Sequence, residues 1–158
     1  FFQDHNLFPN LCVADNVAVG IDPSIRLSEE QASLVRVALS QVGLSEKAAA
    51  FPRELSGGQQ GRVGLARILL RKRPLILLDE PFSALGPALK DEMLDVLSEI
   101  LDITNATALM VTHDTNDAIS FGDQAILVAE GQAYPPQQIK PLLANPPLAL
   151  REYLGNRT

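Results

Sequence analysis

Three features are scarce in this sequence of 158 residues, and each scarcity excludes a class of protein. The single cysteine, Cys12, cannot form an internal disulfide, which excludes a disulfide-stapled secreted framework and fits a reducing compartment. Hydrophobic runs are far shorter than the ~20 residues that a membrane-spanning helix needs. Lys and Arg number 13 against 19 Asp and Glu, a net charge of −6, which argues against nucleic-acid binding by phosphate neutralisation.

The composition is that of a folded domain. Hydrophobic residues make up 46% and charged residues 20% of the chain, close to globular averages, so disorder and low complexity are excluded. The length suits one domain. Because the chain begins with Phe1, without an initiator methionine or a signal-peptide pattern, we expect it to start partway through a longer reading frame.

The first half of the chain is predicted to be helical. Ser28 and Gln31 have capping-box spacing, and apolar residues then recur at helical intervals until Gly43. A shorter helix is predicted over 45–51, before a proline that would end it. A glycine-bearing turn at 55–59 opens another helix that runs to about residue 70.

The second half is predicted to be α/β. Residues 75–78 are apolar without alternation, as in a parallel strand buried on both faces, and Asp79 and Glu80 follow directly. A helix from Pro87 leads to a second apolar strand at 106–112, which ends at His113. This order predicts a right-handed parallel crossover, so the two carboxylates and the histidine are expected at one sheet edge.

The remaining segments are short. The pattern predicts a helix over 115–121, a β-hairpin around Glu130-Gly131 and apolar helical stretches separated by prolines after residue 135.

These residues suit phosphoryl transfer to water. One carboxylate of an Asp-Glu pair can hold Mg²⁺ through water while the other orients or deprotonates the attacking water. The glycines of Leu-Ser-Gly-Gly-Gln let backbone N–H groups approach an anion at a helix N-terminus. Taken singly, each has a structural reading as well: the Asp-Glu pair as a cap or surface pair, the turn as an ordinary turn, and His113 as a structural histidine.

The set of motifs resembles the ATP-binding cassette (ABC) ATPases over nearly the whole chain. The matches follow the family's order and spacing: Gln3 at the Q-loop, 55–59 at the signature motif, 75–80 at Walker B, Ser83-Ala84-Leu85 at the D-loop and His113 at the switch histidine. The resemblance implies a P-loop NTPase-like parallel sheet core, a helical signature subdomain, and a C-terminal β-hairpin plus helices. It divides the chain into a Q-loop (1–8), a helical subdomain (9–70), a core with Walker B, D-loop and H-loop (74–134) and a helical appendage (135–158).

The resemblance also implies roles in ATP hydrolysis with Mg²⁺. Asp79 would bind Mg²⁺ through water, Glu80 would be the general base, and His113 would contact the γ-phosphate. Gln3 would touch Mg²⁺ and water and report nucleotide state to the segment that faces the membrane subunit. The signature residues would reach ATP held by the partner in a head-to-tail dimer; they are Ser56, Gly57, Gly58 and Gln59.

The sequence departs from the family pattern in places. It has no Gly-x-x-x-x-Gly-Lys-[Ser/Thr] phosphate loop, so we expect a C-terminal portion of a full subunit that by itself binds ATP poorly. Gly86 stands where the D-loop usually has Asp, which puts communication between nucleotide sites in question. Gly61 and Gly64 each cost a helix interior about 1 kcal/mol relative to Ala.

Among ABC proteins, the stretches around Gln3, Asn16 and Glu80 resemble importer ATPases, and the run is similar to ATP-binding subunits of bacterial thiamine importers. Sulfate, iron, spermidine and molybdate importers are alternatives. The implied partners are transmembrane permease subunits and, indirectly, a periplasmic or surface solute-binding protein, with no nucleic acid; the implied location is the cytoplasmic face of the bacterial inner membrane. A non-hydrolytic, regulatory or decayed homologue is the second hypothesis. An ABC ATPase acting on DNA or translation is disfavoured by the acidic balance.

Overall fold

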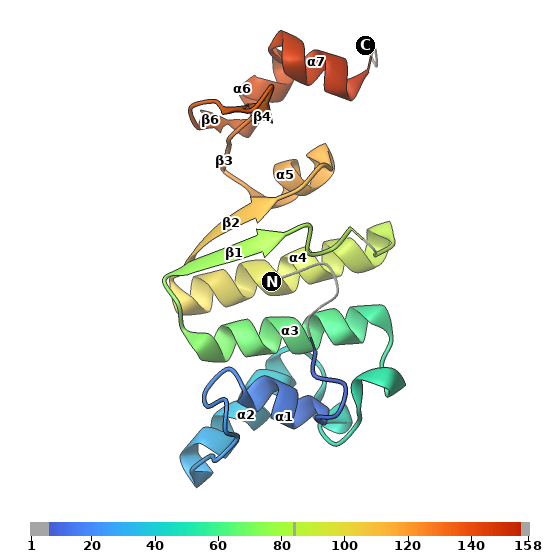
Figure 1. Ribbon diagram of the computed structural model, residues 1–158, viewed down its shortest axis with the longest axis vertical. Helices are drawn as coiled ribbons and strands as arrows, with labels where there is room; N and C mark the ends of the chain where they lie inside the picture. The colour runs from blue at the N-terminus through green and yellow to red at the C-terminus, as the bar shows by residue number, and fades with distance from the viewer. Residues whose placement is uncertain (1–6, 84, 156–158) are drawn as a thin grey trace. The chain divides into compact units, whose positions relative to one another are not determined.

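The computed structural model describes residues 7–83 and 85–155 (Figure 1). The chain is mixed α/β, and it divides into two compact units, Phe1–Val111 and Thr112–Thr158. The first unit holds helices and a pair of parallel strands; the second holds short helices and antiparallel strand pairs. The expected α/β class is thus confirmed. No helix among the described residues is long and apolar enough to cross a bilayer.

The helical part of the first unit contains α1 (Val13–Ala18), α2 (Glu29–Gln41) and α3 (Gly57–Arg71). Helix α3 packs against both of the others, and its buried face includes Val63, Leu65 and Leu69. In the loop between α1 and α2, the Asp22 carboxylate accepts hydrogen bonds from the amide and hydroxyl of Ser24, at 2.8 and 2.7 Å. These bonds lower the pKa of Asp22 because they favour the ionised form.

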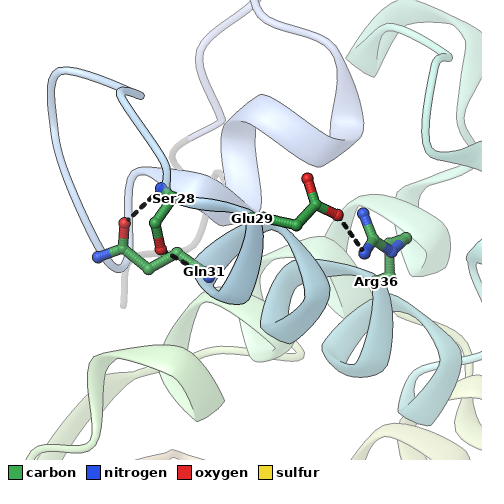
Figure 2. Close-up of polar contacts among 4 residues, drawn as sticks. All are labelled: Ser28, Glu29, Gln31 and Arg36. Atoms are coloured by element: carbon green, nitrogen blue, oxygen red, sulfur yellow. Dashed lines mark hydrogen bonds and ion pairs between the residues drawn. The ribbon is translucent and has the colours of Figure 1, made fainter.

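Helix α2 begins and ends as its sequence predicts. Ser28 Oγ accepts from the Gln31 amide at 3.2 Å, and Gln31 Oε1 accepts from the Ser28 amide at 2.9 Å (Figure 2). Figure 2 also shows the exposed Arg36–Glu29 ion pair, at 3.2 Å. At the other end Gly43 has φ +68°, and the amide of Leu44 donates to a carbonyl of the last turn at 2.8 Å, which is the pattern of a Schellman cap.

The predicted helix over 45–51 is wrong. The structure has only a 3₁₀ turn, η1 (Ser45–Lys47), and a second one, η2 (Pro52–Glu54). The carbonyls of Ala48 and Ala50 accept hydrogen bonds from the amides of Ala14 and Val13, at 2.9 and 2.8 Å. Since these carbonyls satisfy the first amides of α1, they do not serve a longer helix.

The strands β1 (Leu75–Asp79) and β2 (Thr107–Val111) are parallel and are joined by helix α4 (Pro87–Thr104). Their register pairs Leu75 with Thr107 and Asp79 with Val111, so both strands end together. The predicted strand–helix–strand order and parallel pairing are therefore confirmed. Helix α4 also packs against α3, where Arg62 and Glu92 form an ion pair.

The expectation that β1 is buried on both faces is wrong for this chain. Ile76 and Leu78 are buried, at 7% and 1% exposure, whereas Leu75 and Leu77 are 52% and 58% exposed. An apolar run without alternation suits a sheet covered on both faces, but within residues 7–83 and 85–155 only the face of β1 that carries Ile76 and Leu78 is covered.

The second unit begins with α5 (Thr115–Phe121), over the predicted residues. The predicted hairpin pairs β4 (Val128–Ala129) with β5 (Gln132–Ala133), and Glu130 and Gly131 have φ +52° and +74°, as a two-residue type I′ turn requires. The sequence reasoning missed an outer pair, β3 (Gln124–Ala125) with β6 (Gln137–Gln138). Helices α6 (Ile139–Ala144) and α7 (Leu148–Leu154) complete the unit.

Candidate functional site

The Leu-Ser-Gly-Gly-Gln turn is shaped by a capping box at the start of α3. Ser56 Oγ accepts from the Gln59 amide at 3.3 Å, and Gln59 Oε1 accepts from the Ser56 amide at 3.0 Å. Gly57 and Gly58 are the first two residues of the helix, where amides have no acceptor within the helix. Ser56 and Gly57 are exposed. The turn therefore has the features of an anion-binding helix terminus at the surface.

The two glycines of this turn differ in what surrounds them. A Cβ atom on Gly58 would lie 2.5 Å from Cδ2 of Leu89, whereas the nearest atom to one on Gly57 would be Cδ2 of Leu85, at 4.0 Å. Close packing against Leu89 thus gives Gly58 a structural reason to be glycine. Packing does not account for Gly57, which instead leaves its amide open to close approach.

The two acidic candidates lie at the carboxyl end of β1. Asp79 is exposed and is the last residue of the strand, in register with Val111 of β2. Glu80 has φ +41°, in the left-handed region that residues other than glycine rarely adopt. Its amide donates to the Val111 carbonyl at 2.9 Å, and its carbonyl accepts from the Ser83 hydroxyl at 3.1 Å. These bonds hold Glu80 in a strained conformation directly beyond the strand.

The histidine candidate begins the second unit. His113 is exposed and lies between Thr112 and Asp114 in the loop before α5. The Thr112 hydroxyl accepts from the Asp114 amide at 3.0 Å and donates to Oδ2 of Asp117 at 2.9 Å. Asp114 caps α5 through the Asn116 amide, at 2.9 Å. Short side chains therefore fix the backbone on both sides of His113.

The structure brings the signature residues 56–59 together in one turn at the start of α3. It also places Asp79 and Glu80 next to each other at the carboxyl end of β1. His113 belongs to the other compact unit, so its convergence with the two carboxylates stays a prediction. Gln3 and Ala84 lie outside the described residues. Over 7–83 and 85–155, no three His, Cys, Asp or Glu side chains gather as a metal site. Mg²⁺ commonly needs only one or two carboxylates beside phosphate oxygens and water, so the exposed Asp79 carboxylate fits the role expected of it.

Sequence reasoning missed a buried polar cluster that joins the segment before α1 to α3. The Asn16 side chain is fully buried and accepts from the Phe8 amide at 2.8 Å. Its amide nitrogen lies 3.0, 2.9 and 3.1 Å from the carbonyl oxygens of Phe8, Leu11 and Cys12. Arg67 of α3 donates to the Asn16 carbonyl at 2.8 Å and to its Oδ1 at 2.9 Å. One side chain thus ties this segment to the signature helix.

The charge in this cluster, on Arg67, is partly buried. Burial lowers the pKa of Arg67, and the nearby charge of Arg71 acts in the same direction. The guanidinium also lies 5.6 Å from the centre of the Phe8 ring, a cation–π distance. A partial signal for the cluster exists in the sequence, because Asn16 lies beside Val17 and Ala18 in a mostly apolar stretch and Arg67 lies on the apolar side of α3.

Comparison with known proteins gives a consistent result. A family model described as ABC transporter matches residues 1–83. A thiamine import ATP-binding protein of Cereibacter sphaeroides is 56% identical over 98% of this chain and 67% of its own length. Proteins of the same description from a Ruegeria species and a Jannaschia species are 54% and 46% identical over 98% and 97% of this chain. The chain thus spans about two thirds of the length of each of these relatives.

Proposed function

The chain belongs to the ABC transporter family, and from this premise we propose that it works in the ATP-binding subunit of a thiamine importer. The observation that carries the proposal is the identity of 54–56% over 98% of the chain to two thiamine import ATP-binding proteins. Sulfate, iron, spermidine and molybdate remain the alternative cargoes, and the uptake assay below separates them.

The signature turn supports a role in binding ATP across a subunit interface. In this proposal Ser56 and Gln59 hold the turn open at the surface, and the exposed amide of Gly57 faces phosphate oxygens. An anion at this point is favoured by the partial positive charge of α3, which is 15 residues long. The nucleotide itself is held mainly by the other subunit of a head-to-tail dimer, so two chains complete each site.

Hydrolysis is assigned to the end of β1. Glu80 takes a proton from the attacking water as general base, and its strained backbone, directly beyond β1, is of the kind that clusters at active sites. Asp79 and Gln3 would hold Mg²⁺ through water, and the chemistry that the ion would supply there is neutralisation of charge on the phosphates. His113 contacts the γ-phosphate from the loop before α5, which is held by the hydrogen bonds of Thr112 and Asp114. P-loop NTPases share this chemistry and a parallel sheet core, and we place β1 and β2 in such a core.

The transporter context follows from the same premise. We propose residues 1–8 as the Q-loop, 9–70 as the helical subdomain, 74–134 as the Walker B, D-loop and H-loop core, and 135–158 as a helical appendage. Permease subunits are the direct membrane partners, a solute-binding protein acts through them, and the subunit works at the cytoplasmic face of the bacterial inner membrane.

The test is uptake by a reconstituted transporter whose ATP-binding subunit has the relatives' full length and contains this chain. We expect ATP-dependent uptake of thiamine, but not of sulfate, iron, spermidine or molybdate. Glu80→Gln is expected to abolish uptake while ATP still binds, and Glu99→Gln, an exposed carboxylate on α4, serves as the matched control. Uptake of another solute instead of thiamine would overturn the cargo assignment, and full activity of Glu80→Gln would overturn the assignment of the base.

A second function is favoured by one observation. Gly86 is the N-cap of α4 and makes no side-chain cap, where the family usually has an Asp of the D-loop. A non-hydrolytic or regulatory homologue would bind ATP and dimerise without turnover. Measured ATPase activity in the assembled transporter distinguishes the two functions, because only the first predicts steady phosphate release.

A further inference from the structure

The loop that carries His113 is held by one residue from the far end of the chain. Tyr153 of α7 donates its hydroxyl hydrogen to the backbone carbonyl of His113, at 2.9 Å. The two residues are 40 positions apart, and both belong to the second compact unit. The bonds made by Thr112 and Asp114 act on the residues that flank His113, whereas Tyr153 acts on the histidine's own carbonyl.

Packing does not explain the orientation of Tyr153. Its side chain is 61% exposed, while Leu150 on the same helix is 7% exposed and provides the buried anchor of α7. The start of α7 is also tied locally, because Arg151 Nε donates to the Pro146 carbonyl at 2.7 Å. Helix α7 is thus placed by these contacts, and the hydroxyl of Tyr153 is the group that it presents to the His113 loop.

We infer that Tyr153 is a positioning residue for His113. A hydrogen bond to the His113 carbonyl fixes the plane of the peptide that follows the histidine, and so restricts the ψ angle of His113. Together with the bonds of Thr112 and Asp114, this fixes the direction of the His113 Cα–Cβ bond, from which the imidazole extends, before any phosphate arrives. Preorganised groups act in a reaction without a reorganisation cost. The inference deepens the proposed function and rests on it, because it assumes that His113 acts in hydrolysis.

The test compares single and double variants in the assembled transporter. Tyr153→Phe removes only the hydroxyl, Tyr134→Phe removes the same group from the hairpin of the same unit as a control, and His113→Ala removes the positioned side chain. We expect Tyr153→Phe to lower kcat about 2- to 10-fold, the range for losing one hydrogen bond, with KM for ATP unchanged. Tyr134→Phe should match the unchanged protein, and Tyr153→Phe should have no further effect in the His113→Ala background.

The outcomes separate the inference from the proposed function. If His113→Ala is inactive while Tyr153→Phe has an unchanged kcat, the positioning role is wrong and the function stands. If His113→Ala retains full kcat, the role of His113 in hydrolysis is wrong. An equal loss from Tyr153→Phe with and without His113 would also overturn the inference, because it would mark a purely structural effect.

A second measurement covers the case in which Tyr153→Phe weakens folding. In the 158-residue chain, the NMR signal of the His113 ring reports its local environment directly. We expect Tyr153→Phe to shift or broaden this signal and to speed hydrogen exchange in the loop before α5, while Tyr134→Phe does neither. An unchanged His113 signal in folded Tyr153→Phe would refute the positioning role.

Discussion

Asn16→Ala is expected to weaken the first unit strongly, because the Asn16 side chain bonds both to the segment before α1 and to α3. It is fully buried, and its partners are backbone groups of Phe8, Leu11 and Cys12 and the guanidinium of Arg67. Truncation to alanine removes these bonds at a position that has no exposed surface. The carbonyls of Leu11 and Cys12 then lose their bonds to the side-chain amide, and Arg67 keeps its bond to the backbone carbonyl of residue 16 but loses the one to Oδ1.

The magnitude follows from those contacts. The bond to the charged Arg67 contributes about 1.5 kcal/mol, and two further buried bonds about 1 kcal/mol each, which gives roughly 3.5 kcal/mol. Phe8 is 48% exposed, so water can replace part of the hydrogen bonding that its backbone amide and carbonyl lose. The two bonds between the Asn16 side chain and the Phe8 backbone are therefore left out of the sum. For a domain of this size the change corresponds to a fall in melting temperature of roughly 10 °C.

Urea and thermal unfolding followed by circular dichroism measure this change in the 158-residue chain. Asn10→Ala is the matched control, since Asn10 is exposed in the turn before α1 and its replacement should change the unfolding free energy by less than about 0.5 kcal/mol. Equal midpoints for Asn16→Ala and Asn10→Ala would refute the reasoning. Arg67→Lys should lie between them, because lysine keeps the charge but loses the forked donors.

Four other substitutions test separate parts of the structure. Gly58→Ala should lower the melting temperature because its Cβ meets Leu89 at 2.5 Å, whereas Gly57→Ala, with 4.0 Å of clearance, should leave it unchanged. Gly86→Asp should raise the melting temperature slightly, since Asp at the N-cap of a helix stabilises it more than Gly by a few tenths of a kcal/mol. An unchanged melting temperature would refute the prediction that residue 86 can cap α4 through its side chain. Folding lowers the pKa of Asp22, so its ionised carboxylate adds to the free energy of unfolding, and this contribution is lost as pH falls through that pKa. In Asp22→Asn, the urea concentration at the unfolding midpoint should therefore fall less steeply as the pH is lowered.

Local patterns predicted much of the fold because their causes are local. The capping box at Ser28 joins residues three positions apart, and the glycine-bearing turn at 55–59 is contiguous, so the sequence alone indicates where α2 and α3 begin. The same holds for the signature turn and for Asp79 and Glu80, which follow each other at a strand end. A glycine after a periodic stretch likewise predicted the end of α2 at Gly43.

Contacts between distant segments could not be predicted in this way. Asn16 and Arg67 are 51 residues apart, and no local pattern indicates that these two side chains meet. The segment 45–51 loses its helix because α1 takes its carbonyls. The exposure of Leu75 and Leu77 depends on which elements cover each face of the sheet. An apolar run indicates that both faces suit burial, but it does not show which elements cover them.

The backbone of Glu80 creates a conflict between stability and catalysis at one position. Glu80 has φ +41°, and for a residue with a Cβ atom this left-handed conformation lowers the free energy of unfolding by roughly 1 kcal/mol or more. Glycine adopts the same φ without this cost. Glu80→Gly should therefore be among the stabilising substitutions that a selection for heat resistance recovers, and thermal unfolding of that variant would show the gain. Such a selection would drive the proposed general base out of the sequence, so variants evolved only for heat resistance should become more durable and less able to hydrolyse ATP.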